Sequence, residues 1–208
     1  MKEIILNKKT ELKHIFEEMK QLLQKGEVIA FPTDTVYGIG TDIDEPQGIT
    51  NIYIIKHRPV SLPLILLGAN TEQLLPYVKN FSKKARKLTN NFWPGPLTII
   101  LNKSERVNPA ITRLSTIGIR VPDNPFLLEF LTFYDKPLAT TSANLSGYPS
   151  AYKPEDVKKQ FSNSSLALLI NAGETKNKVS SSIIDLTTNP PKILREGALL
   201  AADIFAFL

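Results

Sequence analysis

Short apolar runs alternate with amphipathic segments along most of the chain, and this alternation restricts the fold more than any other feature of the sequence. The apolar runs predict strands at residues 28–31, 64–67, 97–101, 116–121, 138–141, 166–171, 182–186 and 193–195. The amphipathic segments predict helices at residues 10–25, with Thr10 as N-cap, and at 46–57, 71–79, 82–91, 125–133 and 154–160. Because the two kinds of element interleave irregularly, we expect an α/β (α+β) fold with one twisted mixed sheet flanked by helices.

No internal repeat, low-complexity tract or interdomain linker interrupts this pattern. A length of 208 residues lies at the upper end of an ordinary single domain and is enough to bury a continuous core. We therefore expect residues 1–208 to form one domain. The polar stretch of residues 174–182 predicts a mobile loop and not a domain boundary.

The composition excludes several classes of chemistry. The chain has no cysteine, which excludes disulfides, thiolate catalysis and cysteine-type zinc sites. The two histidines, His14 and His57, lack the spacing of metal ligands, so we expect no metal held by protein side chains. The N-terminus turns polar too early for a signal peptide, and no run of about 18 apolar residues occurs. We therefore expect a cytoplasmic protein without a membrane span.

The net charge of +5 and the pI near 9.3 indicate an anionic partner, such as a nucleotide, an RNA or a phosphorylated metabolite. Neither a Gly-x-x-x-x-Gly-Lys phosphate loop nor a Gly-x-Gly-x-x-Gly fingerprint is present. Residues 33–40, which follow the first predicted strand, are instead rich in hydroxyls and glycine, and this composition indicates a functional loop at a strand end.

Two cations stand at the end of the predicted helix at residues 46–57. Lys56 and Arg58 are two residues apart, so an ammonium and a guanidinium could hold one polyphosphate from two sides. Cations at a helix C-terminus also complement the helix dipole, and for an isolated pair this second interpretation is favoured.

Residues 137–147 change from an apolar strand into a run of small hydroxyl and amide side chains that ends at Gly147. Short donors at a strand end, together with exposed backbone N–H groups, suit phosphate oxygens, ribose hydroxyls or an amino acid. A capped tight turn uses the same residue types. From this segment alone, the two interpretations are equally supported.

An arginine lies within the otherwise apolar strand predicted at residues 116–121. An unpaired charge in such a strand would be costly, so Arg120 must meet an anion. The candidates are a structural carboxylate, Asp34 or Asp123, and the carboxylate of a bound substrate. Arg195 poses the same question, although the adjacent Glu196 offers it a simpler partner.

Together, these segments resemble the YrdC-like family of threonylcarbamoyl-AMP synthases, which serve the threonylcarbamoyladenosine modification of tRNA. The resemblance covers about residues 10–197, and the chain is similar to the family's short, single-domain form. Its motifs stand in one order, at residues 31–40, 56–59, 93–98, 118–122, 142–147, 181–186 and 194–197.

The resemblance implies a reaction in which L-threonine, bicarbonate (or CO2) and ATP give threonylcarbamoyl-AMP and pyrophosphate, with Mg²⁺ on the ATP phosphates. Partner proteins would then carry the adenylate on to tRNA. No protein nucleophile is needed, because the amine of threonine captures CO2 and the resulting carbamate attacks the α-phosphorus. The protein is expected to align the reactants and to stabilise the developing phosphate charge.

The resemblance also implies residue roles. It assigns L-threonine to Thr35, Arg120 and Ser181, with Ser142 shared at the junction of the two substrates. It assigns ATP to Arg58, Thr116, Thr140, Ser150 and Arg195, and to Lys56 as a contact for phosphate charge. Asn144 is expected to set the geometry of the site and completes the catalytic set of Lys56, Arg58, Ser142 and Asn144.

The chain departs from the family pattern at two positions. Leu62 stands where the family often has a polar Lys or Asn, and Leu67 stands where some branches have a His. Two alternatives follow. One is a paralogue of the same fold with another activity, although the chain keeps the Lys-x-Arg and Ser-x-Asn signature. The other is a non-catalytic module that binds RNA through its basic surface, and such binding should weaken steeply with salt.

Overall fold

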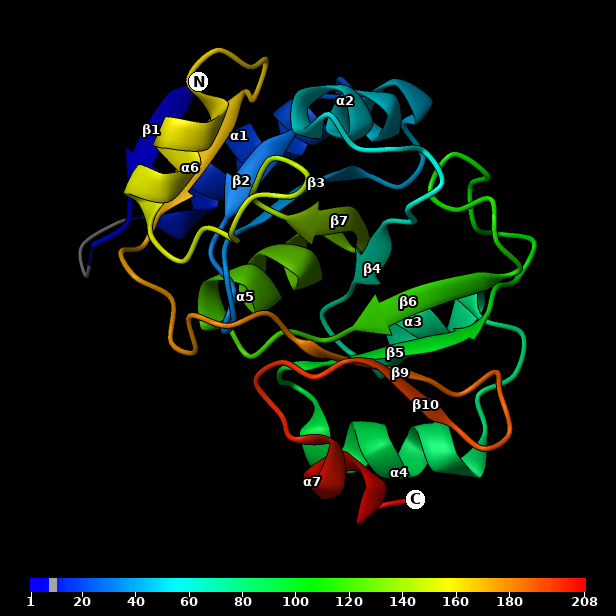
Figure 1. Cartoon of the computed structure of the whole chain (residues 1–208). Helices are drawn as coiled ribbons and strands as arrows, with labels where there is room; N and C mark the ends of the chain where they lie inside the picture. The colour runs from blue at the N-terminus through cyan, green and yellow to red at the C-terminus, as the bar shows by residue number, and fades with distance from the viewer. Residues whose placement is uncertain (8–10) are drawn as a thin grey trace.

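Within residues 1–7 and 11–208, which the computed structural model describes, ten strands form one twisted mixed sheet (Figure 1). In order across the sheet, the strands are β1 (Lys2–Ile5), β8 (Leu168–Asn171), β2 (Ile29–Phe31), β3 (Gly38–Asp42), β7 (Leu138–Ser142), β4 (Ile65–Leu67), β6 (Thr116–Arg120), β5 (Leu97–Asn102), β9 (Ser182–Asp185) and β10 (Lys192–Arg195). Parallel and antiparallel neighbours alternate irregularly, since β4 pairs parallel to β6 and antiparallel to β7. This confirms the expected fold class.

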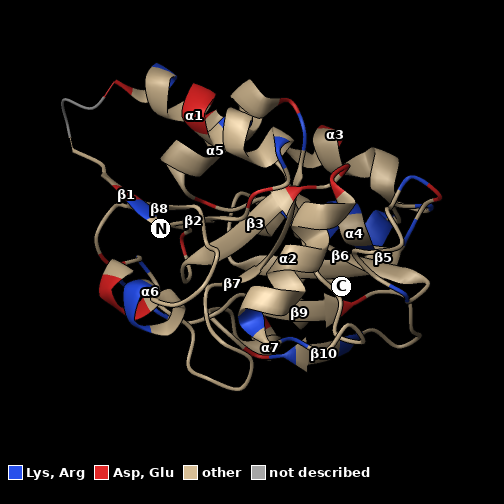
Figure 2. Cartoon of the chain, turned by 90° about the horizontal axis from the view of Figure 1, so that it is seen from above, with Lys and Arg blue, Asp and Glu red and all other residues tan. Residues whose placement is uncertain are grey.

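Helices cover both faces of the sheet. They are α1 (Leu12–Gln24), α2 (Pro46–Lys56), α3 (Thr71–Leu74), α4 (Lys83–Phe92), α5 (Pro125–Tyr134), α6 (Pro154–Phe161) and α7 (Ala201–Phe205), with a 3₁₀ turn η1 (Leu75–Tyr77). The helices α1 and α5 lie side by side on one face (Figure 2), where Phe16 packs against Phe126 and Phe130. The other helices bury their apolar side chains on the opposite face. No helix of the described residues is long and apolar enough to cross a membrane.

Most of the expected elements are confirmed, with shifts of one or two residues at their ends. The helix expected at residues 71–79 is wrong in its second half, because α3 ends at Leu74 and a 3₁₀ turn follows. Pro76 has no N–H to donate within that turn. The strands β1 and β3 and the helix α7 were not predicted from the sequence. The expected N-cap, Thr10, lies outside the described residues, and the residue before α1 is Glu11, which makes no side-chain cap.

The strand β3 occupies residues that the sequence analysis had taken for part of a loop. Its formation depends on contacts with other strands, since Gly38 and Gly40 pack directly against the ring of Phe31 on β2. A Cβ atom at Gly40 would lie 2.9 Å from the methyl group of Thr140, which is tighter than real Cβ contacts. The missing side chains therefore let β3 fit between β2 and β7.

The position of α2 matters for the site, because its last turn carries Lys56. The helix approaches β3 closely at Gly48, where a Cβ atom would lie 2.1 Å from Oγ1 of Thr41. That hydroxyl donates to the carbonyl oxygen of Glu27 and so cannot easily turn away. Glycine at this position thus sets the distance between α2 and the sheet.

Helices cover one face of the sheet over some of its strands and leave it open over others. Over β8, β2 and β7 it lies beneath α1 and α5. Further along, on β4, β6 and β5, the same face is formed by alternate residues, namely Ile65, Leu67, Gly118, Arg120, Thr98 and Ile100. Their neighbours in sequence, such as Leu66, Ile119 and Ile99, point into the core on the other face. These alternate residues form the floor of a cavity.

Candidate functional site

A cavity of about 420 Å³ lies over this part of the sheet. Its floor comes from β4, β5, β6 and β9, and its walls come from the β2–β3 loop, the end of β7 and the residues before β9. Strands that are far apart in the sequence therefore meet at one site. A volume of this size falls within the range of small-molecule binding sites.

The structure brings most of the predicted site residues together. Those that line the cavity are Thr35, Arg58, Thr116, Arg120, Thr140, Ser142, Ser181 and Arg195. The side chains of Lys56, Asn144 and Ser150 do not line it. Ser150 lies beside the wall, since its Oγ is 3.4 Å from Oγ of the lining residue Ser180.

Arg120 lies in a buried part of the cavity lining. Its guanidinium donates to the carbonyl oxygen of Gly95 at 2.9 Å, to Oγ1 of Thr35 at 3.0 Å and to the carboxylate of Asp34. Arg120 and Asp34 are both almost fully buried, with 4% and 3% of their surfaces exposed. Asp34 is thus the carboxylate, of the two proposed from the sequence, that pairs with Arg120, whereas Asp123 pairs with Lys176.

This pairing leaves limited capacity for a substrate. A guanidinium has five N–H donors, and three of those on Arg120 are directed at the partners named above. A substrate carboxylate would be a second anion and would use the donors that remain. Oδ2 of Asp34 is buried and has no hydrogen-bond partner among the described residues. The contact between Arg120 and L-threonine stays a prediction.

The β2–β3 loop around Thr35 is held rigidly, as the hydroxyl-rich composition of the segment allows. Oγ1 of Thr33 donates to the carbonyl oxygen of Val36 at 2.7 Å and accepts from the backbone N–H of Thr35. From outside the loop, Thr175 donates to the carbonyl oxygen of Thr35 and Asn177 to that of Asp34. The segment at residues 174–182, expected to be a mobile loop, thus supplies two of the groups that fix this wall.

Lys56 and Arg58 point in different directions because the backbone reverses between them. His57 adopts the left-handed conformation, with φ of 51°, and ends α2. Arg58 then turns toward the cavity, where it donates to the carbonyl oxygens of Leu62 and Pro63. The two cations are therefore not placed to hold one polyphosphate from two sides, which was one of the two interpretations of the sequence.

Lys56 turns inward and is 1% exposed. Its Nζ donates to the carbonyl oxygens of Ser142 and Asn144, and its own carbonyl oxygen accepts from the N–H of Ser146. Burial, with a smaller contribution from Arg58, lowers the pKa of Lys56 to about 7, and a neutral amine can also donate to two carbonyls. This geometry makes Lys56 a support for the turn after β7, and its expected contact with phosphate stays a prediction.

The same turn is shaped by Asn144. Its Oδ1 accepts from the hydroxyl of Ser142 at 2.5 Å, and its Nδ2 donates to the carbonyl oxygens of Leu145 and Tyr148. Asn144 thus ties the turn together, and its predicted role in setting the geometry of the site stays a prediction. Ser142 is thereby held at the edge of the cavity.

The sequence analysis missed Thr98 as a site residue. Thr98 is 1% exposed, lines the cavity, and has its Oγ1 2.9 Å from Oγ of Ser181. Arg195 donates to the same Ser181, to its carbonyl oxygen at 2.9 Å and to its hydroxyl at 3.2 Å. The alternation of the strand at residues 97–101 was a usable signal, because it places Thr98 on the face opposite Leu97 and Ile99.

The two departures from the family pattern have different positions. Leu67 is buried and lines the cavity, so it makes one part of the floor apolar. Leu62 is 45% exposed and does not line it, although its carbonyl oxygen accepts from Arg58.

The cavity favours an anion. Three arginines line it, and its lining includes no carboxylate among the described residues. Arg120 has its partner in Asp34, but no described carboxylate lies within ion-pair distance of Arg58 or Arg195. Partial burial lowers the pKa of Arg58, yet a guanidinium stays charged at neutral pH. A bound polyphosphate would supply the missing negative charge.

Comparisons with known proteins give the chain relatives over most of its length. Residues 21–197 match the family model Sua5_yciO_yrdC, which is described as "Telomere recombination". A threonylcarbamoyl-AMP synthase of Pyrococcus abyssi is 39% identical over 88% of this chain, and the alignment spans 54% of that relative's length. A threonylcarbamoyl-AMP synthase of Vibrio campbellii is 38% identical over 88% of this chain and 98% of its own length.

Solved structures agree with these relatives. The P. abyssi Sua5 protein complexed with L-threonine has a TM-score of 0.94 and 36% identity, over all of this chain and 61% of the other. The E. coli protein YciO has a TM-score of 0.85 and 28% identity, over all of this chain and 98% of the other. On the family match, the sequence identities and the shared fold, the chain belongs to the Sua5/YciO/YrdC family.

Proposed function

We propose that the protein is a threonylcarbamoyl-AMP synthase, which converts L-threonine, bicarbonate (or CO2) and ATP into threonylcarbamoyl-AMP and pyrophosphate. One observation carries the proposal: a single cavity joins a buried polar end, made by Arg120, Thr35 and Ser181, to arginines that have no carboxylate partner among the described residues. The names of the relatives and the L-threonine complex of one of them support the choice of substrates.

The residues divide between the two substrates in this proposal. The polar end holds L-threonine, with Arg120, Thr35 and Ser181 directed at its carboxylate and hydroxyl. The nucleotide lies along the rest of the cavity, against Arg58, Thr116, Thr140 and Arg195, and reaches toward Ser150. Ser142 stands between them, at the place where the carbamate and the α-phosphate must meet.

The chemistry in this proposal needs no nucleophile from the protein. The free amine of threonine adds to CO2 and loses a proton, which gives a carbamate. A carbamate oxygen then attacks the α-phosphorus of ATP, the bond to the β-phosphate bridging oxygen breaks, and pyrophosphate leaves. The protein contributes alignment of two bound reactants and fixed positive charge beside the phosphates, both of which lower the barrier.

Magnesium belongs to this proposal as the companion of ATP. In nucleotide sites Mg²⁺ keeps several waters and is held largely by phosphate oxygens. The described lining of the cavity offers hydroxyls, such as those of Thr116 and Thr140, and no carboxylate, so the phosphates of ATP would have to supply the charged ligands of such an ion. When bound, the ion would neutralise part of the charge on the phosphates.

Two further points complete the proposal. The adenylate would be taken up by tRNA-modifying partner proteins, and the reaction would take place in the cytoplasm. Direct RNA binding through the basic surface is the competing class of function, and it requires neither threonine nor ATP.

The proposal predicts that ATP releases pyrophosphate only when both L-threonine and bicarbonate are present. The measurement is phosphate formed in a coupled assay with pyrophosphatase, with each substrate omitted in turn. Release at the same rate without L-threonine would contradict the synthase assignment. If no release occurs and the protein instead retains double-stranded RNA at physiological salt, the RNA-binding module is the better assignment.

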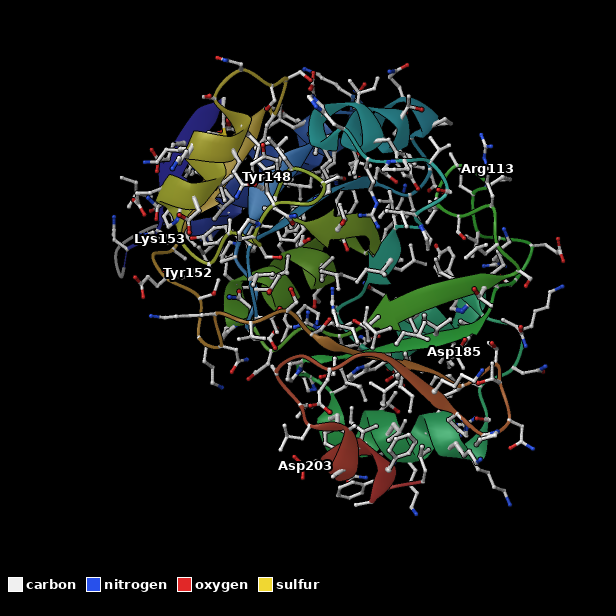
Figure 3. The ribbon with its side chains drawn as sticks, viewed as in Figure 1. Arg113, Tyr148, Tyr152, Lys153, Asp185 and Asp203 are labelled. Atoms are coloured by element: carbon white, nitrogen blue, oxygen red, sulfur yellow. The ribbon has the colours of Figure 1, made fainter. Side chains whose placement is uncertain are left out.

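Arg58 is predicted to contact phosphate. The variant Arg58→Ala should raise KM for ATP by about 10- to 100-fold, because a hydrogen bond to a charged group is lost. The variant Arg58→Lys keeps the charge without the planar fork and should recover part of the loss. Arg113→Ala is the matched control, since Arg113 is exposed at the edge of the molecule (Figure 3) and does not line the cavity. Unchanged pyrophosphate release by Arg58→Ala would remove the phosphate role.

Lys56 is predicted to act mainly through the turn after β7. Lys56→Met keeps the apolar stem but removes the donors to two carbonyl oxygens, and it should lower the free energy of unfolding by about 1–3 kcal/mol. Urea denaturation measures this loss, with Lys87→Met on the exposed side of α4 as control. A Lys56→Met protein as stable as the wild type, but with a higher KM for ATP, would make phosphate contact the main role of Lys56.

A further inference from the structure

Thr98 lines the cavity beside Ser181, and its surroundings explain how it is held there. It is the second residue of β5, which pairs in parallel register with β9, so that Leu97 lies beside Ser182. The backbone N–H of Ser182 also donates to the carbonyl oxygen of Pro96. These bonds fix the residue before β9, Ser181, next to the hydroxyl of Thr98.

The hydroxyl of Thr98 has one partner among the described residues, and that partner is Oγ of Ser181, 2.9 Å away. Thr98 is 1% exposed, so its hydrogen cannot turn to bulk solvent. Leaving a buried hydroxyl hydrogen without an acceptor is costly. The favoured arrangement therefore has Thr98 donating to Ser181.

This direction settles what Ser181 can still do. A serine hydroxyl has one hydrogen to donate and two lone pairs that accept. Thr98 occupies one lone pair, and Arg195 occupies the other by donating from Nη2 at 3.2 Å. The hydrogen of Ser181 is then the capacity that remains, and Ser181 lines the cavity. A group that can only donate suits a carboxylate oxygen and does not suit an ammonium.

We propose that Thr98 is a positioning residue, which directs the hydroxyl of Ser181 to donate to the carboxylate of the amino-acid substrate. This inference rests on the proposed function, because it assumes that an amino acid occupies the polar end of the cavity. Arg195 is linked to the same hydroxyl, so the arrangement also joins the amino-acid end of the cavity to the nucleotide end.

The test compares Thr98→Val with Thr98→Ser in the full-length protein. Valine keeps the shape but has no hydroxyl, whereas serine keeps the hydroxyl. Thr98→Val should raise KM for L-threonine by about 5- to 20-fold, because the hydroxyl of Ser181 is then no longer directed to donate to the charged carboxylate of the substrate. For the same variant, KM for ATP should rise less. For Thr98→Ser, KM for L-threonine should stay within about 2-fold of the wild-type value.

Thr89→Val is the matched control for removal of a buried threonine hydroxyl. Thr89 is 4% exposed on α4, donates to the carbonyl oxygen of Arg86, and does not line the cavity. It should leave both KM values unchanged. Isothermal titration of L-threonine into each variant checks binding apart from turnover, and thermal unfolding checks that each variant is folded.

Two results would overturn the inference while leaving the proposed function intact. One is a Thr98→Val protein whose KM for L-threonine matches that of Thr89→Val. The other is a Thr98→Val protein in which KM for L-threonine and for ATP rise equally and serine gives no recovery, which would indicate general distortion. If the wild-type protein neither binds nor consumes L-threonine, the proposed function itself fails.

Discussion

The buried guanidinium of Arg120 holds together the parts of the molecule that make the site. From β6 it reaches the turn before β5 through Gly95 and the β2–β3 loop through Thr35 and Asp34. Those segments come from different regions of the sheet. A buried ion pair adds little net stability, but losing one partner costs about 3–5 kcal/mol, because it leaves an uncompensated charge. The pair therefore fixes the geometry of the polar end more than it adds stability.

The rest of the cavity exists because helices cover only part of one face of the sheet. The helices α1 and α5 cover one face only as far as the middle strands, and the uncovered part presents Ile65, Gly118 and Ile100 as an apolar floor. Cations and hydroxyls surround this floor, and the lining includes no carboxylate from the part of the chain that the structure describes. Such a lining has the chemistry that we propose for binding a nucleotide, an anion with an apolar body, next to a small polar molecule. Lys56, in the last turn of α2, stabilises the turn that carries Ser142 by donating to the carbonyl oxygen of Ser142.

Much of this could be predicted from the sequence, and the failures have physical reasons. Apolar periodicity located most strands and helices, because burial on one or two faces imposes it. It missed β3, since Gly38 and Gly40 disfavour a strand locally and the strand depends on packing against Phe31. It could not show that His57 reverses the backbone and separates Lys56 from Arg58. The ordered motifs of the sequence located most of the residues that line the cavity. Whether a hydroxyl donates or accepts, as at Thr98, depends on residues that are distant in the sequence, so it could not be predicted.

The central claim is that one cavity holds the amino acid at its buried end and the phosphates beside the unpaired arginines. A crystal structure of the protein with L-threonine and a non-hydrolysable ATP analogue tests it most directly. The account predicts the threonine carboxylate within hydrogen-bond distance of Arg120 and Ser181, and phosphate oxygens beside Arg58 and Arg195. Phosphates at the Arg120 end, or an amino acid bound outside the cavity while Arg58 keeps only its carbonyl partners, would contradict it.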